Sequence, residues 1–474
     1  MKQEPAPLNR RKFLGQAACA GLGLTGVLST LGTLRLFNAT LSAQGLPGGG
    51  DDYRALVCLF LFGGNDGNNV LVPMDTTGYG NYSRDRGILA LPRTNLLPLI
   101  LPEGDGREFG LHPAMSRLRT LFNSGQAAVV ANVGTLVAPI TKADYQSGGA
   151  AIPPYLFSHN DQQVQWQTSV PDSPKKVGWG GRMADLLQAL NTGSQISMNI
   201  SLAGNNFFQV GNEVVQYHVG PGGSLGLRQY NETWTPIREQ YTATRAMLGR
   251  SYGHIFEQEY ADILNRAIAN DTLLQQQLVT APGFAAEFAA STGTTGALTP
   301  IAAQLRMIAR LISVRQSLGM KRQIYFAALG GFDTHDDQLE DHSYLLGQLS
   351  NAMADFHAAT TTMGIADKVT LFTASDFNRT YNSNGKGSDH AWGNHQFVMG
   401  GGVRGGRLYG EIPTLDIGGP DDTGTRGSWI PKISTDEFSA TLARWFGVSP
   451  GDLPLVLPNI GRFENTDLGF MNSI

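Results

Sequence analysis

Four short apolar segments, each followed at once by small or polar residues, constrain the fold of this chain more than any other feature. The first runs from Ala55 to Phe62 without alternating polar residues, which is typical of a strand buried on both faces. Similar segments follow at 127–135, 323–335 and 368–377. Amphipathic helices are predicted between them at 115–125, 298–316 and 343–364. Strands that alternate with helices predict an α/β fold with a mostly parallel central sheet and helices on both faces.

The middle of the chain, residues 180–297, has a different pattern. Its first part is typical of a β-hairpin with loops, and residues 240–292 are typical of helix. We interpret this β/α segment as an insertion or cap on the main sheet. The folded domain is therefore predicted to span residues 44–474 as one unit.

The first 43 residues are predicted to be an export signal that is removed from the folded protein. The sequence RRKFL, which begins at Arg10, precedes a moderately apolar stretch and resembles a twin-arginine (Tat) signal. A membrane anchor or an ordinary Sec signal is the alternative, but Arg35 interrupts the apolar stretch and makes it a poor stop-transfer helix. We expect the Tat translocase as a partner during export, cleavage near Ala43, and a final location in the periplasm or at the cell surface.

Charge and cysteine content narrow the range of partners. The chain has a formal net charge of −4, and loss of the signal would remove five basic side chains but only one acidic one. Because a protein that binds phosphate backbones needs a basic face, we expect no nucleic-acid partner. Only Cys58 remains after cleavage, so no internal disulfide is predicted.

Acidic side chains follow three of the four predicted strands. Asp66, Asp333 and Asp376 each lie within a few residues of a strand end, and His335 lies two residues after Asp333. In a parallel sheet, functional groups collect beyond the carboxyl ends of the strands, so these side chains are expected to share one edge. The alternative is structural, because Asp66 could stabilise a turn and the other two aspartates could cap helices.

The segment SDHAWGNH, residues 388–395, adds one carboxylate and two imidazoles. These are Asp389, His390 and His395. Carboxylate and imidazole are the ligands that divalent metals such as Zn²⁺ or Mn²⁺ take in proteins. Together with the strand-end residues they suffice for two metal ions. The glycine-rich segment 400–410 that follows lacks the phosphate-loop pattern, and a tight hairpin is predicted there.

The order of four motifs resembles the exported DUF1501 family. The motifs are LFLFGGNDGNNVLVP, LFSHNDQQVQWQT, GGFDTHDDQ and FTASDFNRTYNSNGKGSDHAWGNHQFVMGGGVRGGRLYG, beginning at residues 59, 156, 330 and 372. The resemblance implies the fold of the alkaline phosphatase/sulfatase superfamily, with a metal pair, usually zinc, at the strand ends. By position it implies metal ligands at Asp66, Asp333, His335, Asp376 and either His390 or His395.

Two features depart from that superfamily. Phe377 follows Asp376 where the superfamily usually has a histidine, so the pair Asp389-His390 is the alternative source of those ligands. The nucleophile is also not evident. Ser158 is preferred because it opens a predicted helix, whose N-terminus favours a developing anion, and Thr135 is the second candidate.

The resemblance, together with these residues, implies an exported metal-dependent hydrolase of phosphate or sulfate esters, acting on a small-molecule or glycan ester. Zinc is the expected cofactor, with manganese or calcium as alternatives, and Arg379 is expected to clamp a substrate oxygen. The alternative is a non-catalytic surface protein of the same fold that binds a metal, a glycan or a partner protein. A purely structural surface protein would leave the three strand-end aspartates apart.

Overall fold

The computed structural model describes residues 52–174, 176–224 and 235–472. The chain divides into a unit of residues 1–49 and a unit of residues 50–474, and only the second lies in the described part. The predicted export signal therefore lies outside the described residues. Among the helices of the described ranges, none has both the length and the apolar character needed to cross a membrane.

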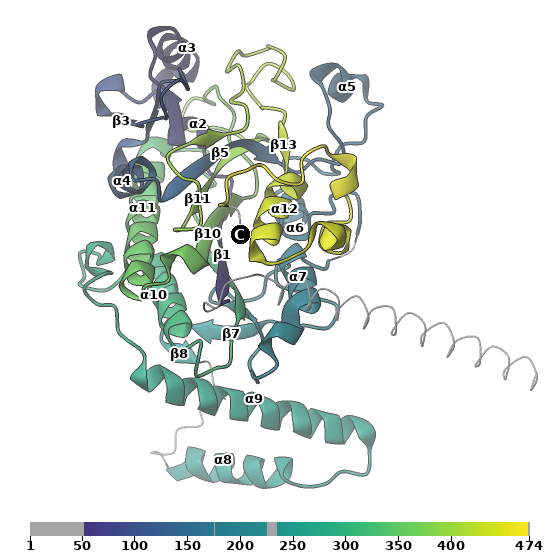
Figure 1. Ribbon diagram of the computed structural model, residues 1–474. Helices are drawn as coiled ribbons and strands as arrows, with labels where there is room; N and C mark the ends of the chain where they lie inside the picture. The colour runs from purple at the N-terminus through teal and green to yellow at the C-terminus, as the bar shows by residue number, and fades with distance from the viewer. Residues whose placement is uncertain (1–51, 175, 225–234, 473–474) are drawn as a thin grey trace, which may run out of the picture. The chain divides into compact units, whose positions relative to one another are not determined.

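A large mixed sheet forms the centre of the domain (Figure 1). Its strands are β1 (Arg54–Leu61), β5 (Ala127–Gly134), β6 (Asn199–Ser201), β7 (Tyr217–Gly220), β8 (Gly223–Ser224), β9 (Arg322–Leu329), β10 (Val369–Ser375), β11 (Asn394–Met399), β12 (Leu408–Tyr409) and β13 (Ile433–Ser434). Nine of them follow the order β12-β5-β11-β10-β1-β9-β6-β7-β8, and β13 pairs with β5. β1 pairs in parallel with both β9 and β10, whereas β11 is antiparallel to β10 and β5. The four predicted strands are confirmed as β1, β5, β9 and β10.

Strand β1 lies at the middle of the sheet because every one of its apolar side chains is buried. Ala55, Val57, Leu59 and Leu61 belong to the main core cluster on one face. Phe60 points to the other face, where its ring lies 6.2 Å from that of Phe326 on β9. Each large apolar side chain buried in this way contributes about 1.5–3 kcal/mol. Burial on both faces explains why the sequence does not alternate.

Helices cover both faces of the sheet (Figure 1). On one face lie α4 (Ser116–Asn123), α10 (Pro300–Ser313) and α11 (Gln338–Thr362), which confirm the three predicted helices. On the other face lie α6 (His159–Thr168), α7 (Trp179–Leu187) and α12 (Thr435–Phe446). Aromatic side chains pack between the sheet and the helices on the second face, where Trp179 and Phe438 both contact Phe372 of β10. The predicted α/β fold, with a mostly parallel sheet between two helical layers, is confirmed.

Smaller elements complete the domain around the sheet ends. A second sheet consists of β2 (Leu71–Pro73), β3 (Leu97–Pro98) and β4 (Phe109–Leu111). The remaining short helices are α2 (Gly67–Val70), α3 (Thr76–Arg86), α5 (Lys142–Ser147) and α13 (Leu453–Val456). Single 3₁₀ turns lie at Gly87–Leu89, Arg93–Asn95, Pro113–Met115, Gln188–Asn191, Ala289–Ser291, Ala366–Lys368, Pro450–Asp452 and Ile460–Arg462.

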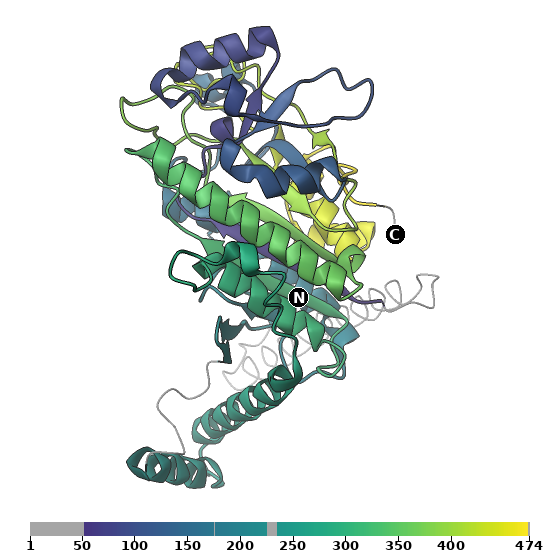
Figure 2. The same ribbon diagram turned by 90° about the vertical axis from the view of Figure 1, so that its left-hand side faces the viewer.

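The middle of the chain contributes to the central sheet and also extends away from it. β6 adds to the sheet beside β9, and β7 and β8 form a short antiparallel hairpin at its edge. Helices α8 (Thr235–Leu248) and α9 (Ile255–Thr280) then form a helical hairpin that projects from the sheet (Figures 1 and 2). The interpretation of this segment as an insertion or cap stays a prediction.

The glycine-rich segment 400–410 differs from its prediction. It connects β11 to β12, and these two strands lie on opposite sides of β5, so the segment crosses the end of β5 instead of forming a tight hairpin. A Cβ atom at Gly405 would lie 2.4 Å from the carbonyl oxygen of Gly125 and 2.7 Å from that of Ala127. Glycine is therefore required for a close backbone crossing.

Candidate metal centre

Three neighbouring strands bring the candidate residues to one edge of the sheet. β9, β1 and β10 are adjacent and parallel, so the loops after them meet at their carboxyl ends. The loop after β9 carries Asp333 and His335, and the loop after β10 carries His390. Gly63, in the turn after β1, has a φ of +111°, and a Cβ there would lie 2.4 Å from the backbone nitrogen of Asp333. This glycine allows the two loops to touch.

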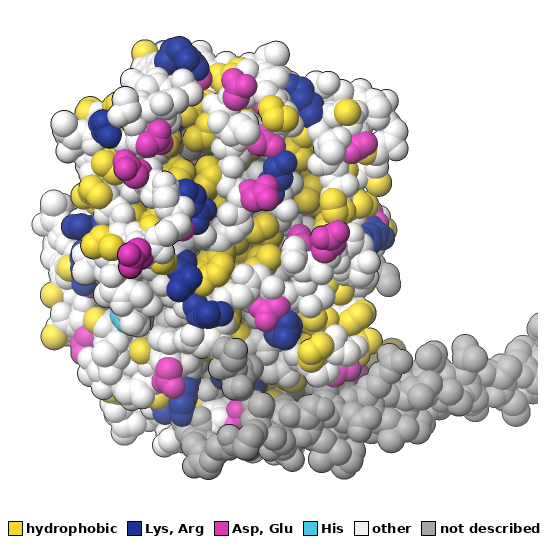
Figure 3. Space-filling model, turned by 45° about the horizontal axis from the view of Figure 1, so that its top comes forward, with side chains coloured by type: hydrophobic (Ala, Val, Ile, Leu, Met, Phe, Trp, Pro, Cys, Tyr) yellow, Lys and Arg dark blue, Asp and Glu magenta, His cyan; other side chains and the backbone are white. Residues whose placement is uncertain are grey.

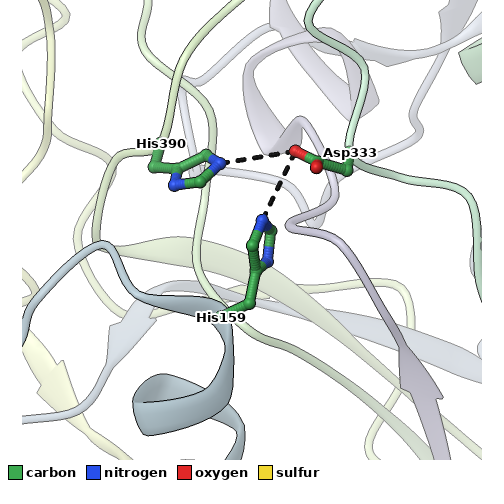
Figure 4. Close-up of side chains that lie close together, drawn as sticks. All are labelled: His159, Asp333 and His390. Carbon is green, nitrogen blue, oxygen red and sulfur yellow. Dashed lines mark hydrogen bonds and ion pairs between the residues drawn. The ribbon is translucent and has the colours of Figure 1, made fainter.

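Three imidazoles converge on one carboxylate oxygen. Asp333 Oδ1 lies 3.4 Å from Nε2 of His159, 3.3 Å from Nε2 of His390 and 3.1 Å from Nε2 of His335. Figure 4 shows the rings of His159 and His390 with these nitrogens directed at Asp333. The side chain of Asp333 is 48% exposed, so the convergence point is open to solvent.

The opposite nitrogen of each imidazole is held by an oxygen atom. Nδ1 of His159 lies 2.7 Å from Asp376 Oδ2, and Nδ1 of His390 lies 2.7 Å from the carbonyl oxygen of Phe157. Nδ1 of His335 lies 3.2 Å from Asp389 Oδ1. A carbonyl oxygen only accepts, so Nδ1 of His390 carries its proton, and the carboxylates favour the same tautomer in the other two rings. Each Nε2 then presents a lone pair toward Asp333.

This arrangement leaves electron pairs facing one another. Nε2 of His335 and Nε2 of His390 lie 3.1 Å apart, and two lone pairs at that distance repel unless a proton or a cation lies between them. Nε2 of His159 is buried and makes no hydrogen bond. The ligand atoms of His159, Asp333 and His390 all lie within 4.8 Å of one another. The residues therefore fit a divalent metal that takes nitrogen and oxygen ligands, such as zinc.

The Asp333 carboxylate, which the three imidazoles approach, also forms an ion pair with Arg379. Arg379 is fully buried and donates from Nη2 to Asp333 Oδ1, and its Nη1 lies 3.4 Å from Nε2 of His335. Partial burial of Asp333 opposes its ionisation, but the Arg379 hydrogen bond and the nearby positive charge together outweigh it and lower the pKa of this carboxyl. Asp333 is therefore ionised at neutral pH, as a metal ligand must be.

Local environments shift the pKa values of two imidazoles in opposite directions. The hydrogen bond to Asp376 raises the pKa of His159, although burial opposes it. Burial lowers the pKa of His390, which keeps that ring neutral and able to coordinate a cation. The pKa of Asp389 falls to about 2, because hydrogen bonds from Asn384 and Arg426 outweigh its partial burial.

Asp376 reaches the cluster only through His159. Its Oδ2 accepts from the backbone nitrogen of Gly63 at 3.2 Å and from Gln163 Nε2 at 2.9 Å, in addition to His159. It is fully buried, and the loop that follows it is not a helix that it could cap. The structure therefore places Asp376 behind an imidazole, where it orients the ring.

Asp66 and His395 lie outside the cluster. Asp66 is fully buried, forms an ion pair with Arg86 of α3, and accepts from Gln338 Nε2 at 2.5 Å. His395 lies on β11, where its Nδ1 accepts from the backbone nitrogen of Asn132 at 3.2 Å and burial lowers its pKa to about 4. Both residues serve buried hydrogen-bond networks away from Asp333.

The residues predicted to act on substrate are engaged elsewhere. Ser158 precedes α6 as predicted, but its hydroxyl donates to Asp161 at 2.6 Å. Thr135 is buried and its hydroxyl donates to Gln162 Oε1 at 2.7 Å. Arg379 donates to the carbonyl oxygens of four residues as well as to Asp333; these are Gly63, Gly64, Phe332 and Ser388.

His159 was not among the metal ligands predicted from the sequence. The structure makes it a central member of the cluster, because α6 begins at this residue and directs its ring toward Asp333 (Figure 4). The preceding Phe157 has a φ of +72°, and this left-handed conformation accompanies the carbonyl contact to His390. The histidine in the short sequence Phe157-Ser158-His159 was the available sign of a further ligand. It was overlooked because it lies far along the sequence from the motifs that contain Asp333 and His390.

A family model described as "Protein of unknown function (DUF1501)" matches residues 53–419. No curated protein matches the sequence. Similar solved structures include the lipoteichoic acid synthase LtaP from Listeria monocytogenes, with a TM-score of 0.36, 8% identity, and 92% of this chain and 81% of that chain covered.

Two further solved structures are similar at the same level. The PsFucS1 sulfatase from Pseudoalteromonas sp. has a TM-score of 0.33, 10% identity, and coverage of 90% of this chain and 72% of that one. The phosphonate monoester hydrolase SpPMH from Silicibacter pomeroyi has a TM-score of 0.33, 7% identity, and coverage of 86% and 77%.

Proposed function

The chain belongs to the DUF1501 family. From its motifs and the geometry of its metal centre, we propose that it is a metal-dependent hydrolase of phosphate or sulfate esters. One observation carries the proposal. The Nε2 atoms of three histidines converge on Asp333 Oδ1, and each ring is fixed from behind by an oxygen acceptor. Oriented imidazoles of this kind are typical of metal sites.

His159, Asp333 and His390 would hold the metal, with His335 beside them. When bound, a divalent ion there supplies Lewis-acid polarisation of an ester oxygen. Asp376 holds the proton on Nδ1 of His159 and thereby keeps Nε2 available. Arg379 keeps Asp333 ionised and offsets its charge. These residues fix the charge and tautomer of the site before substrate enters.

Exposure of the site favours attack by water. The His335 side chain is 44% exposed, and its Nδ1 contacts Asp389, so its Nε2 adds a further lone pair to the site. The buried hydroxyl of Thr135 donates to the amide of Gln162, which is no base, and this argues against a covalent intermediate on Thr135. The hydroxyl of Ser158 donates to the Asp161 carboxylate, so Ser158 stays a candidate nucleophile. Figure 3 shows Lys and Arg side chains interspersed with Asp and Glu on one face of the molecule, which supports a small-molecule or glycan ester over nucleic acid.

A non-catalytic metal- or glycan-binding protein is the second candidate. One observation favours it: Arg379 is fully buried and donates to four carbonyl oxygens and to Asp333, so it is poorly placed to clamp a substrate oxygen. Turnover separates the two candidates, because both require a metal and only a hydrolase releases alcohol from an ester.

Metal binding is tested first by calorimetric titration of Zn²⁺, Mn²⁺ and Ca²⁺ into chelator-treated protein. We expect binding that weakens by more than about 100-fold in His159→Ala and in His390→Ala. His218→Ala, on β7 outside the cluster, is the matched control and should bind as the wild type does. Absence of binding by the wild type would refute the proposal.

Catalysis is tested next with nitrophenyl phosphate and nitrophenyl sulfate in the presence of the preferred metal. Release of nitrophenol that disappears in His390→Ala and persists in His218→Ala is expected of a hydrolase. Metal binding without turnover on either ester would leave the binding protein as the correct candidate.

We also infer export through the Tat translocase to the periplasm or the cell surface. The support is the RRKFL sequence at residues 10–14 and the apolar stretch after it. These residues lie outside the described part of the chain.

A further inference from the structure

The α8–α9 hairpin exposes several large apolar side chains to solvent. The C-terminal half of α9 is anchored in the main core by Leu274 and Leu278. Its N-terminal half extends beyond the sheet with α8 alongside (Figures 1 and 2). There Phe256 is 76% exposed, Tyr260 64% and Ile263 50%. Clustered apolar exposure of this kind marks an interaction surface.

The exposed side chains form a regular stripe along one side of α9. Phe256, Tyr260, Ile263 and the exposed Ala267 are spaced by four, three and four residues, which is the repeat of a coiled-coil seam. Ala261 is buried on a different side of the helix. α9 therefore has a buried face at Ala261 and, beside it, a mostly exposed apolar face, here called the α9 stripe, of which Phe256 and Tyr260 also line the groove toward α8.

We propose that the α9 stripe is the interface between two copies of this chain, with α9 packed antiparallel against α9 of the partner. A symmetric pair requires a surface that complements itself. The register that sets Tyr260 opposite the partner's Ile263 also sets Phe256 opposite the partner's Ala267. Large side chains thus meet smaller ones at each layer of the seam, as interdigitating helices require.

Charges beside the stripe complement each other in the same register. Glu259 and Arg266 are seven residues apart and lie on the same edge of the seam. In an antiparallel pair, Glu259 faces the partner's Arg266, and two-fold symmetry repeats this contact at the other end. Within one chain Arg266 and Glu259 already approach to 2.9 Å and are 61% and 57% exposed, so they are free to exchange partners.

The groove between α8 and α9 enlarges the surface beside the stripe. It has a volume of about 630 Å³ and includes Met247, Leu248, Phe256 and Tyr260 in its lining. A lipid surface fits this region less well, because Glu257 and Glu259 flank the apolar side chains and repel anionic headgroups. A second copy of the chain carries arginine as well as glutamate at this edge, so it can pair with the acidic side chains that would repel a lipid surface.

The experiment is sedimentation of the full chain over about 1 to 200 μM, the range in which a micromolar dimer dissociates. We expect a monomer–dimer equilibrium for the wild type and a monomer for Tyr260→Lys. Tyr344→Lys is the matched control, because Tyr344 is 68% exposed on α11, away from the hairpin, and should leave the equilibrium unchanged. A wild-type monomer throughout, or equal dimerisation of Tyr260→Lys, would overturn the proposal.

Charge exchange tests the register itself. Glu259→Arg and Arg266→Glu each place like charges opposite one another, so each variant alone should dimerise about 5-fold or more weakly. A mixture of the two variants restores opposite charges at both ends, so heterodimers should form more tightly than either homodimer. Failure of the mixture to recover association would rule out this antiparallel register. The outcome is independent of metal binding and hydrolysis.

Discussion

Asp376→Asn is the substitution that best separates a metal site from a hydrogen-bond network. Asp376 Oδ2 accepts from His159, Gly63 and Gln163, and an amide oxygen of the same shape can accept from all three. The variant therefore keeps the position of His159 but removes the negative charge behind it. Loss of such a partner typically weakens metal binding by about 10- to 100-fold, or roughly 1.4 to 2.7 kcal/mol.

The same difference must appear in stability. At a free metal concentration of about 1,000 times the dissociation constant, binding stabilises the wild type by about 4 kcal/mol. At that concentration the metal should stabilise Asp376→Asn by about 1.4 to 2.7 kcal/mol less. Chemical unfolding with and without metal, beside calorimetric affinities, measures both quantities in one set of samples. The metal-free comparison accounts for the buried amide, which loses a charge but gains an unpaired N–H.

Asp389→Asn is the matched control, because its carboxylate supports His335 at 3.2 Å and is 36% exposed. Solvent screens it, so we expect less than a tenfold loss of affinity. The reasoning is refuted if Asp376→Asn binds metal as tightly as the wild type while His159→Ala does not. In that case the contact between Asp376 and His159 would be structural only.

Three other measurements test separate parts of the molecule. Arg86→Met leaves the fully buried Asp66 without its cation and should lower the free energy of unfolding by about 3–5 kcal/mol in urea titrations; a loss below about 1 kcal/mol would contradict the buried ion pair. Burial raises the pKa of Asp436 to about 7, so wild-type stability should fall as pH rises from about 4 to 7, by up to about 4 kcal/mol. Asp436→Asn should remove that slope in thermal unfolding, and a wild type without the slope would show that the carboxyl ionises freely. Replacing both Arg10 and Arg11 by lysine should abolish export of a reporter fused after the first 43 residues, and unchanged export would exclude the Tat route.

The local pattern of the sequence was sufficient to predict the framework of the fold. β1, β5, β9 and β10 are apolar without alternation because both of their faces are buried, and that property is visible in the sequence. The position of Asp333 and His335 at the edge of the sheet also follows from it, because parallel strands end at one edge, whereas His390 lies far along the loop after β10 and its approach to Asp333 does not follow.

Which distant side chain each charged residue contacts could not be predicted in the same way. Asp66 follows β1 as a ligand would, yet Arg86 reaches it from α3 and neutralises it inside the protein. Asp376 follows β10 directly, yet its carboxylate contacts His159, more than two hundred residues earlier. His395, five residues after His390, lies within β11 and is buried away from the cluster.

The sequence by itself determined the α/β framework, the sheet edge at which chemistry is possible, and the kinds of side chain that gather there. Only the tertiary structure decided that His159 joins the cluster and that Asp376 contacts the far side of its ring. It also decided that Asp66 and Asp333 each form an ion pair with an arginine. The reason is physical. Burial and periodicity act on neighbouring residues and leave a local pattern, whereas the pairing of a charge depends on which distant side chain folding brings within about 3 Å of it.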